Sequence, residues 1–88
     1  MQHYSLFLYV SSTCAKCKMI EPLLKDYLKT RPDISYYFEI NIDKKDGFQL
    51  ALKNNVFSLP TLLILLDEKE VKRFTSNFTL EDIKEYLN

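Results

Sequence analysis

The sequence predicts an α/β fold in which a mixed four-stranded sheet carries helices on both faces. Apolar runs of strand length alternate with segments whose apolar residues recur at helical spacing, and the resulting order is β-α-β-α-β-β-α. Only residues 67–69 separate the last two strands, and so short a connection makes them antiparallel. The chain of 88 residues has one glycine and no linker, repeat or low-complexity tract. We therefore expect a single domain over residues 1–88.

The first strand and the first helix are separated by a short polar segment. Residues 5–10 form a continuous apolar run, which is typical of a strand buried on both faces of a sheet. Residues 11–13, Ser-Ser-Thr, end that run and favour a helix start. From Ala15 the apolar period becomes helical, and Pro22 is expected to kink this helix. Its predicted apolar face is formed by Met19, Ile20, Leu23, Leu24, Tyr27 and Leu28.

The remaining elements are shorter. The apolar pattern predicts strands at residues 34–42, 61–66 and 70–75. Between the first two of these strands, Asp46 and Gly47 open a short helix whose apolar residues are Phe48, Ala51 and Leu52. Asn55 is suited to the left-handed conformation that ends such a helix. The last helix has Thr79 as its predicted N-cap and Asp82 three residues later, a variant of the capping box.

The composition argues against several classes of function. With 47% apolar and 14% aromatic residues, the chain can form a core without a metal ion or a disulfide framework. Lys and Arg total 12, as do Asp and Glu, so no field of one sign attracts nucleic acid. The N-terminus lacks the features of a signal peptide, and no run approaches the roughly 20 apolar residues that cross a bilayer. We expect a cytoplasmic protein that binds neither nucleic acid nor membranes.

The only two cysteines, Cys14 and Cys17, lie at the predicted start of the first helix. Residues three apart on a helix have β-carbons about 5–6 Å apart, so a disulfide is within reach. The positive end of the helix stabilises a thiolate at Cys14 and lowers its pKa from the free value of about 8.5, and Lys16 and Lys18 add positive charge. We expect Cys14 to attack a substrate disulfide, and the more buried Cys17 to resolve the mixed disulfide.

Two other interpretations of the cysteine pair stay open at this point. Two cysteines at this spacing are half of a zinc site, but a structural zinc ion needs four protein ligands. His3 is the only other soft ligand, so we expect no metal unless two chains share an ion. The pair can also be inert, because free cysteines are often simply buried.

The sequence resembles the thioredoxin superfamily, and thioredoxins more than glutaredoxins. The resemblance rests on C-A-K-C-K-M-I-E-P-L-L at 14–24 and on N-N-V-F-S-L-P-T-L-L-I-L at 54–65. It implies a reductase of protein disulfides without a bound cofactor, a monomer that receives electrons from a flavin-dependent thioredoxin reductase and NADPH or from glutathione. It also implies a cis peptide bond between Leu59 and Pro60, with the Leu59 backbone exposed to pair with a substrate peptide. Thr13, Ala15 and Lys16 would line the same substrate site.

The sequence departs from the thioredoxin pattern at several places. It lacks the N-terminal strand and helix of full-length thioredoxins. Thr13 replaces the usual tryptophan, and Ala15-Lys16 replaces the usual Gly-Pro. The family's buried aspartate is Leu8 here, and the lysine that pairs with it is Glu39. One hypothesis is that Glu39 supplies the proton-transfer carboxylate, and the alternative is that Glu39 faces solvent and water serves instead.

The sequence leaves three other functions open. A glutaredoxin would need glycines where the chain has F-T-S-N-F-T at 74–79, although Lys16 can pair with a glutathione carboxylate. A thioredoxin fold can also be a binding module with a non-catalytic cysteine pair, since fold does not determine function. An isomerase or oxidase would suit an exported protein, and we find no export signal.

Overall fold

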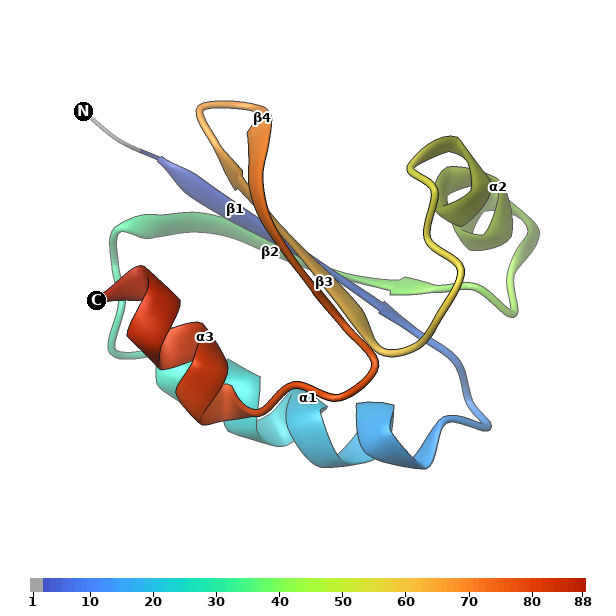
Figure 1. Ribbon diagram of the computed structural model, residues 1–88, viewed down its shortest axis with the longest axis horizontal. Coiled ribbons are helices and arrows are strands. Elements are labelled where there is room, and N and C mark those ends of the chain that lie inside the picture. Colours follow the sequence, from blue (N-terminus) through green and yellow to red (C-terminus); the bar gives the residue numbers. More distant parts are fainter. Residues whose placement is uncertain (1–2) are drawn as a thin grey trace.

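A central sheet of four strands organises the chain, with helices on both of its faces, as predicted. The computed structural model describes residues 3–88. The strands are β1 (Tyr4–Val10), β2 (Ile34–Asn41), β3 (Thr61–Leu66) and β4 (Lys69–Thr75), and the helices are α1 (Ala15–Leu28), α2 (Lys45–Lys53) and α3 (Leu80–Leu87). Helices α1 and α3 lie on one face of the sheet and α2 lies on the other (Figure 1).

The sheet is mixed, and its spatial order is β2-β1-β3-β4. β1 is parallel to β2 and antiparallel to β3, and β3 is antiparallel to β4. On β1, Leu8 lies opposite Glu39 of β2 and Leu62 of β3. The register therefore places Glu39 on the strand next to Leu8, at the two positions where the sequence departs from the thioredoxin pattern.

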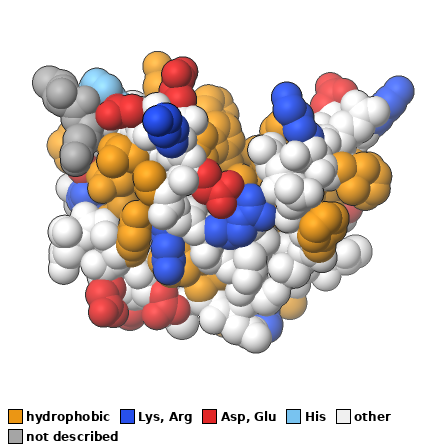
Figure 2. Space-filling model, turned by 45° about the horizontal axis from the view of Figure 1, so that its top comes forward, with side chains coloured by type: hydrophobic (Ala, Val, Ile, Leu, Met, Phe, Trp, Pro, Cys, Tyr) orange, Lys and Arg blue, Asp and Glu red, His pale blue; other side chains and the backbone are white. Residues whose placement is uncertain are grey.

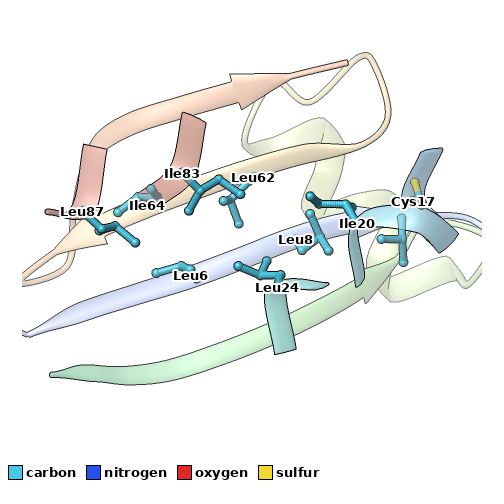
Figure 3. Close-up of a cluster of buried hydrophobic side chains, with 10 residues drawn as sticks. Leu6, Leu8, Cys17, Ile20, Leu24, Leu62, Ile64, Ile83 and Leu87 are labelled. Atoms are coloured by element: carbon cyan, nitrogen blue, oxygen red, sulfur yellow. The ribbon is translucent and has the colours of Figure 1, made fainter. Parts of the chain in front are cut away.

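Two separate clusters of apolar side chains hold the layers together. The larger cluster lies between the sheet and α1 and α3 (Figure 3), and contains Leu6, Leu8, Val10, Cys17, Ile20, Leu24, Leu62, Ile64, Ile83 and Leu87. The smaller cluster lies under α2 and contains Tyr9, Ala51, Val56 and Leu63. Alternate residues of β1 enter opposite clusters, because successive side chains of a strand point to opposite faces. A continuous apolar run is thus buried on both faces, as predicted.

The predicted apolar faces of two helices are wider than the buried ones. Met19 and Leu23 of α1 are 70% and 51% exposed, and Phe48 and Leu52 of α2 are 50% and 51% exposed. A helix that packs on a sheet from one side buries only one stripe, which in α1 contains Cys17, Ile20 and Leu24. The prediction that Met19 and Leu23 belong to the core face was therefore wrong.

The ends of the helices follow the sequence signals. Thr79 caps α3 as predicted, and its side chain and that of Asp82 form a reciprocal capping box. Asn55 has a φ of 57°, the left-handed conformation predicted for it. The guanidinium group of Arg73 on β4 donates hydrogen bonds of 2.8 and 2.9 Å to the carbonyls of Asn54 and Asn55. Arg73 therefore joins the end of α2 to the edge of the sheet.

One turn and one position in a helix impose strict steric demands. In the turn between β3 and β4, Asp67 and Glu68 both have positive φ angles, of 49° and 73°. In α2, Gly47 lies so close to the end of β2 that an added β-carbon would be 2.8 Å from the carbonyl carbon of Asn41. Real β-carbons essentially never come within 3.0 Å of such an atom. Gly47 therefore allows α2 to approach the end of β2.

The two edge strands carry different side chains. β4 has three cations, Lys69, Lys72 and Arg73, and a bulge in its pairing with β3. β2 has no Lys, Arg or Pro, and exposes Tyr36 and Phe38, whose rings stack at 6.1 Å. Figure 2 brings the α2 side of the sheet forward and shows exposed hydrophobic groups among charged side chains. No helix within residues 3–88 is long and apolar enough to cross a membrane.

Candidate redox site at the start of α1

Cys14 and Cys17 form a disulfide at the N-terminus of α1, with their α-carbons 5.3 Å apart. Cys14 is the N-cap residue, and its Sγ accepts a hydrogen bond of 3.2 Å from the backbone N–H of Cys17. Cys14 is partly exposed, whereas Cys17 is fully buried in the larger core cluster. The Cys14 sulfur thus lies at the positive end of the helix dipole and can be reached from outside.

The loop between β1 and α1 is held by polar contacts. The backbone N–H of Cys14 donates to the carbonyl of Ser11, and the hydroxyls of Ser11 and Thr13 are 3.3 Å apart. Asp43, which follows β2, accepts hydrogen bonds of 2.8 and 2.6 Å from the N–H and the hydroxyl of Ser12. These bonds hold the pKa of Asp43 below its usual range. No local pattern in the sequence predicts this anchor, because Asp43 is 31 residues from Ser12.

Leu59 and Pro60 lie directly before β3, and the peptide bond between them is cis. Pro60 is buried, and its carbonyl accepts a 2.8 Å hydrogen bond from the N–H of Ser76. Leu59 is partly buried and packs against both core clusters. Within residues 3–88, the backbone N–H and carbonyl of Leu59 form no hydrogen bond. The Leu59 backbone therefore keeps its hydrogen-bonding capacity.

A groove of about 360 Å³ runs between α1 and the segment that joins β4 to α3. Its lining includes Lys16, Met19, Ile20, Leu23, Pro60, Asn77, Phe78 and Leu80. The ammonium group of Lys16 donates a hydrogen bond to the side-chain carbonyl of Asn77 across this groove. The groove accounts for the exposure of Met19 and Leu23, since both side chains form part of its apolar wall.

Comparison with known proteins agrees with this arrangement. A family model described as Thioredoxin matches residues 2–88. The chain belongs to the thioredoxin family. Thioredoxin-1 of Saccharomyces cerevisiae is 31% identical over 65 residues, which make up 74% of this chain and 60% of the yeast protein. The chain thus spans about 60% of the length of this curated thioredoxin.

Solved thioredoxin structures have the same fold. Thioredoxin 1 from the thermophilic eubacterium Thermosipho africanus superimposes with a TM-score of 0.76 at 26% identity, and the match covers 94% of this chain and 93% of that one. A chain of a ferredoxin:thioredoxin reductase and thioredoxin f2 complex gives a TM-score of 0.83 at 24% identity, covering 97% and 74%. These similarities confirm the thioredoxin-like fold predicted from the sequence.

Three positions where this chain departs from the family pattern are exposed around the cysteines. Thr13, Ala15 and Lys16 are all exposed to solvent. Lys16 is the only charged residue between the two cysteines, and its contact with Asn77 keeps the ammonium group at the groove. These side chains are therefore available to a partner that approaches the disulfide.

Glu39 lies on the α1 side of the sheet, where its carboxyl group contacts two neighbours. The Tyr37 hydroxyl donates a 2.7 Å hydrogen bond to Glu39 Oε2, and Lys25 Nζ is 3.5 Å from the same oxygen. Burial and the Glu39 carboxylate together raise the pKa of Tyr37. The Glu39 side chain is 26% exposed and forms no hydrogen bond to either cysteine. Its role in proton transfer stays a hypothesis.

The residues near the disulfide do not form a metal centre. Within residues 3–88, no three His, Cys, Asp or Glu side chains are grouped closely enough to hold an ion. His3, the other soft ligand in the sequence, is at the far end of β1, and its ring nitrogen lies 3.1 Å from the Ser35 hydroxyl. The cysteines are bonded to each other.

Proposed function

We propose that this chain is a thiol–disulfide oxidoreductase that reduces disulfides of protein substrates through Cys14 and Cys17. The observation that carries the proposal is the hydrogen bond from the Cys17 N–H to Cys14 Sγ at the start of α1. The same N–H and the helix dipole stabilise negative charge on that sulfur after reduction. Membership of the thioredoxin family supports the same chemistry.

The different exposure of the two cysteines supports a different role for each. In the reduced protein, the Cys14 thiolate attacks one sulfur of a substrate disulfide, forms a mixed disulfide and expels the other substrate sulfur as a thiolate. The Cys17 thiolate then attacks Cys14 Sγ, which closes the Cys14–Cys17 bond and releases the second substrate thiolate. Two electrons pass to the substrate, and both leaving thiolates take up protons. Because Cys17 is buried, its thiolate can attack the mixed disulfide at Cys14 but not a disulfide of a free substrate.

A substrate peptide would bind beside the disulfide. The Leu59 backbone has an N–H and a carbonyl without partners in residues 3–88, so an extended peptide can pair with it as a strand does. Thr13, Ala15 and Lys16 are exposed next to the cysteines in the chain and would contact the same peptide. Pro60 would hold the Leu59 backbone in place, because the Pro60 carbonyl accepts a hydrogen bond from the N–H of Ser76.

The oxidised protein needs an electron donor. We propose a flavin-dependent thioredoxin reductase that uses NADPH, with glutathione as the alternative. The fold is shared with a chain from a complex that contains a ferredoxin:thioredoxin reductase, and this supports a protein donor as a class. We further propose that the chain acts as a monomeric domain in the cytoplasm, without a bound cofactor.

Insulin reduction tests the proposal directly. The protein is mixed with insulin, first with dithiothreitol and then with NADPH and either a thioredoxin reductase or the glutathione system. We expect faster insulin precipitation and NADPH oxidation with the reductase. Cys14→Ser should abolish both signals, and Cys17→Ser should trap a mixed disulfide visible by mass spectrometry. Turnover only with glutathione would assign the glutaredoxin-type activity, and equal results for Cys14→Ser and the wild type would refute the proposal.

A further inference from the structure

Four titratable side chains meet where α1 packs beside β2. They are Glu21 and Lys25 from α1 and Tyr37 and Glu39 from β2. Glu39 accepts the Tyr37 hydrogen bond and lies near the Lys25 ammonium group, so both contacts fix the position of its carboxylate. A second carboxyl group close to a fixed carboxylate experiences like-charge repulsion, which favours its protonated form.

Glu21 is that second carboxyl group. It is partly buried and forms no hydrogen bond or ion pair within residues 3–88. Burial, and next the Glu39 carboxylate, raise the pKa of Glu21, while Lys25 and Lys18 oppose this. Tyr37 also faces it from β2. A carboxylate that binds a proton at higher pH than a free one is a stronger base, and is therefore better suited to take a proton from a thiol.

Helix geometry places Glu21 beside the resolving cysteine. Glu21 follows Cys17 by four residues, a spacing that puts two β-carbons about 6 Å apart on one side of a helix. In a helix the Cα–Cβ bonds tilt toward the N-terminus, so this bond of Glu21 points toward the turn that contains Cys17. Cys17 and Leu8 belong to the same buried cluster (Figure 3), and β1 offers no acidic residue to this cluster. The other carboxylate of α1, Asp26, is exposed and pairs with Lys29.

We propose that Glu21 is the proton acceptor for Cys17 when the mixed disulfide is resolved, and that Glu39 is a positioning residue that acts through Glu21. This role rests on the proposed function and extends it. The Cys17 S–H bond breaks and its proton passes to the Glu21 carboxylate. The Cys17 thiolate then forms the bond to Cys14 as the bond between Cys14 and the substrate breaks, and the electron pair leaves on the substrate sulfur. Glu21 afterwards returns the proton to water.

A chromogenic disulfide separates the two sulfur-exchange steps. Reduced protein is mixed in a stopped-flow instrument with dithiobis-nitrobenzoate, which releases one coloured thiolate when Cys14 attacks and a second when Cys17 resolves the adduct. Both phases are followed as a function of pH. For Glu21→Gln, we expect the second phase to slow about ten-fold or more at neutral pH and its pH midpoint to rise. The first phase should not change.

Matched variants separate proton transfer from a structural effect. Glu21→Asp keeps a carboxyl group and should recover part of the lost rate. Glu39→Gln should slow the second phase about three-fold and move its midpoint to lower pH, since Glu21 loses its negative neighbour. Asp26→Asn removes a solvent-facing carboxylate from the same helix and should leave both phases unchanged.

Two failures have distinct signatures. If wild-type protein releases the first thiolate but never the second, the proposed function is wrong and the role of Glu21 falls with it. If the wild type completes both phases and Glu21→Gln matches it in rate and pH midpoint, the proposed function stands and only the role of Glu21 is refuted. An unchanged far-ultraviolet circular dichroism spectrum would show that each variant is folded like the wild type, so that a change in rate reflects the chemistry.

Discussion

Substitution of Gly47 by alanine brings two physical effects into opposition. Alanine in place of glycine within an exposed helix raises stability by about 1 kcal/mol, because it restricts the unfolded chain. In α2, however, the new β-carbon would overlap the backbone carbonyl of Asn41. That carbonyl belongs to the end of β2 and accepts a 3.3 Å hydrogen bond from the N–H of Lys44, so it has little freedom to move.

The cost of the steric overlap should exceed the gain in helix propensity. Overpacking against a fixed group costs about 1–3 kcal/mol. Displacement of the Asn41 carbonyl would also weaken its hydrogen bond with Lys44, which is worth about 1 kcal/mol. After subtraction of the gain in helix propensity, we expect Gly47→Ala to lower the free energy of unfolding by about 2 kcal/mol. For a domain of this size, that loss lowers the melting temperature by about 8–16 °C.

Urea denaturation followed by circular dichroism measures this loss, with the slope of the transition checked for two-state behaviour. Gln49→Ala serves as the control, because Gln49 is an exposed residue of the same helix and should stay within about 0.5 kcal/mol of the wild type. If Gly47→Ala is as stable as the wild type or more so, the close approach of α2 to β2 is wrong.

Three further predictions concern single side chains. Glu68→Gly should raise the melting temperature by several degrees, because a left-handed φ costs a residue with a β-carbon about 1–2 kcal/mol; a lower temperature would contradict this. Arg73→Lys should lower the free energy of unfolding by about 1–2 kcal/mol in urea, since lysine cannot hold Glu70 and the two carbonyls after α2 at once. Arg73 lowers the pKa of Glu70, so the stability that this pair contributes is complete above the unfolded-state pKa of Glu70. This stability disappears as pH falls through the lower folded-state pKa of Glu70. The variant should therefore lose less stability than the wild type on acidification. Lys16→Glu should slow alkylation of reduced Cys14 by iodoacetamide about three-fold at neutral pH and move its pH midpoint upward, and an unchanged midpoint would remove Lys16 from thiolate stabilisation.

Local signals predicted most of the elements and the centre of the site. The change of apolar period at Ala15 placed Cys14 at a helix start, and the structure has Cys14 as the N-cap. Thr79 and Asn55 marked a helix start and a helix end, because capping and left-handed geometry depend on only a few neighbouring residues. These features need no knowledge of distant parts of the chain.

Contacts between distant segments could not be predicted in the same way. Lys16 contacts Asn77, and Asp43 holds Ser12, across 61 and 31 residues of sequence. The groove that exposes Met19 depends on where the segment after β4 passes α1, which no periodicity encodes. Glu21 had a local signal, its spacing of four from Cys17. Its raised pKa, however, depends first on burial and then on Glu39 of β2, and only the fold supplies both.

The difference between the two edge strands limits how copies of this chain can associate through their sheets. The exposed strand backbone of an edge is a template for another strand, and lysine and arginine side chains discourage such pairing. Here the three cations of β4 protect one edge, while β2 has no Lys or Arg and exposes Tyr36 and Phe38. Two copies joined through β2 would leave only their β4 edges outward. Association of these sheets would therefore end at a pair and could not propagate into a fibre.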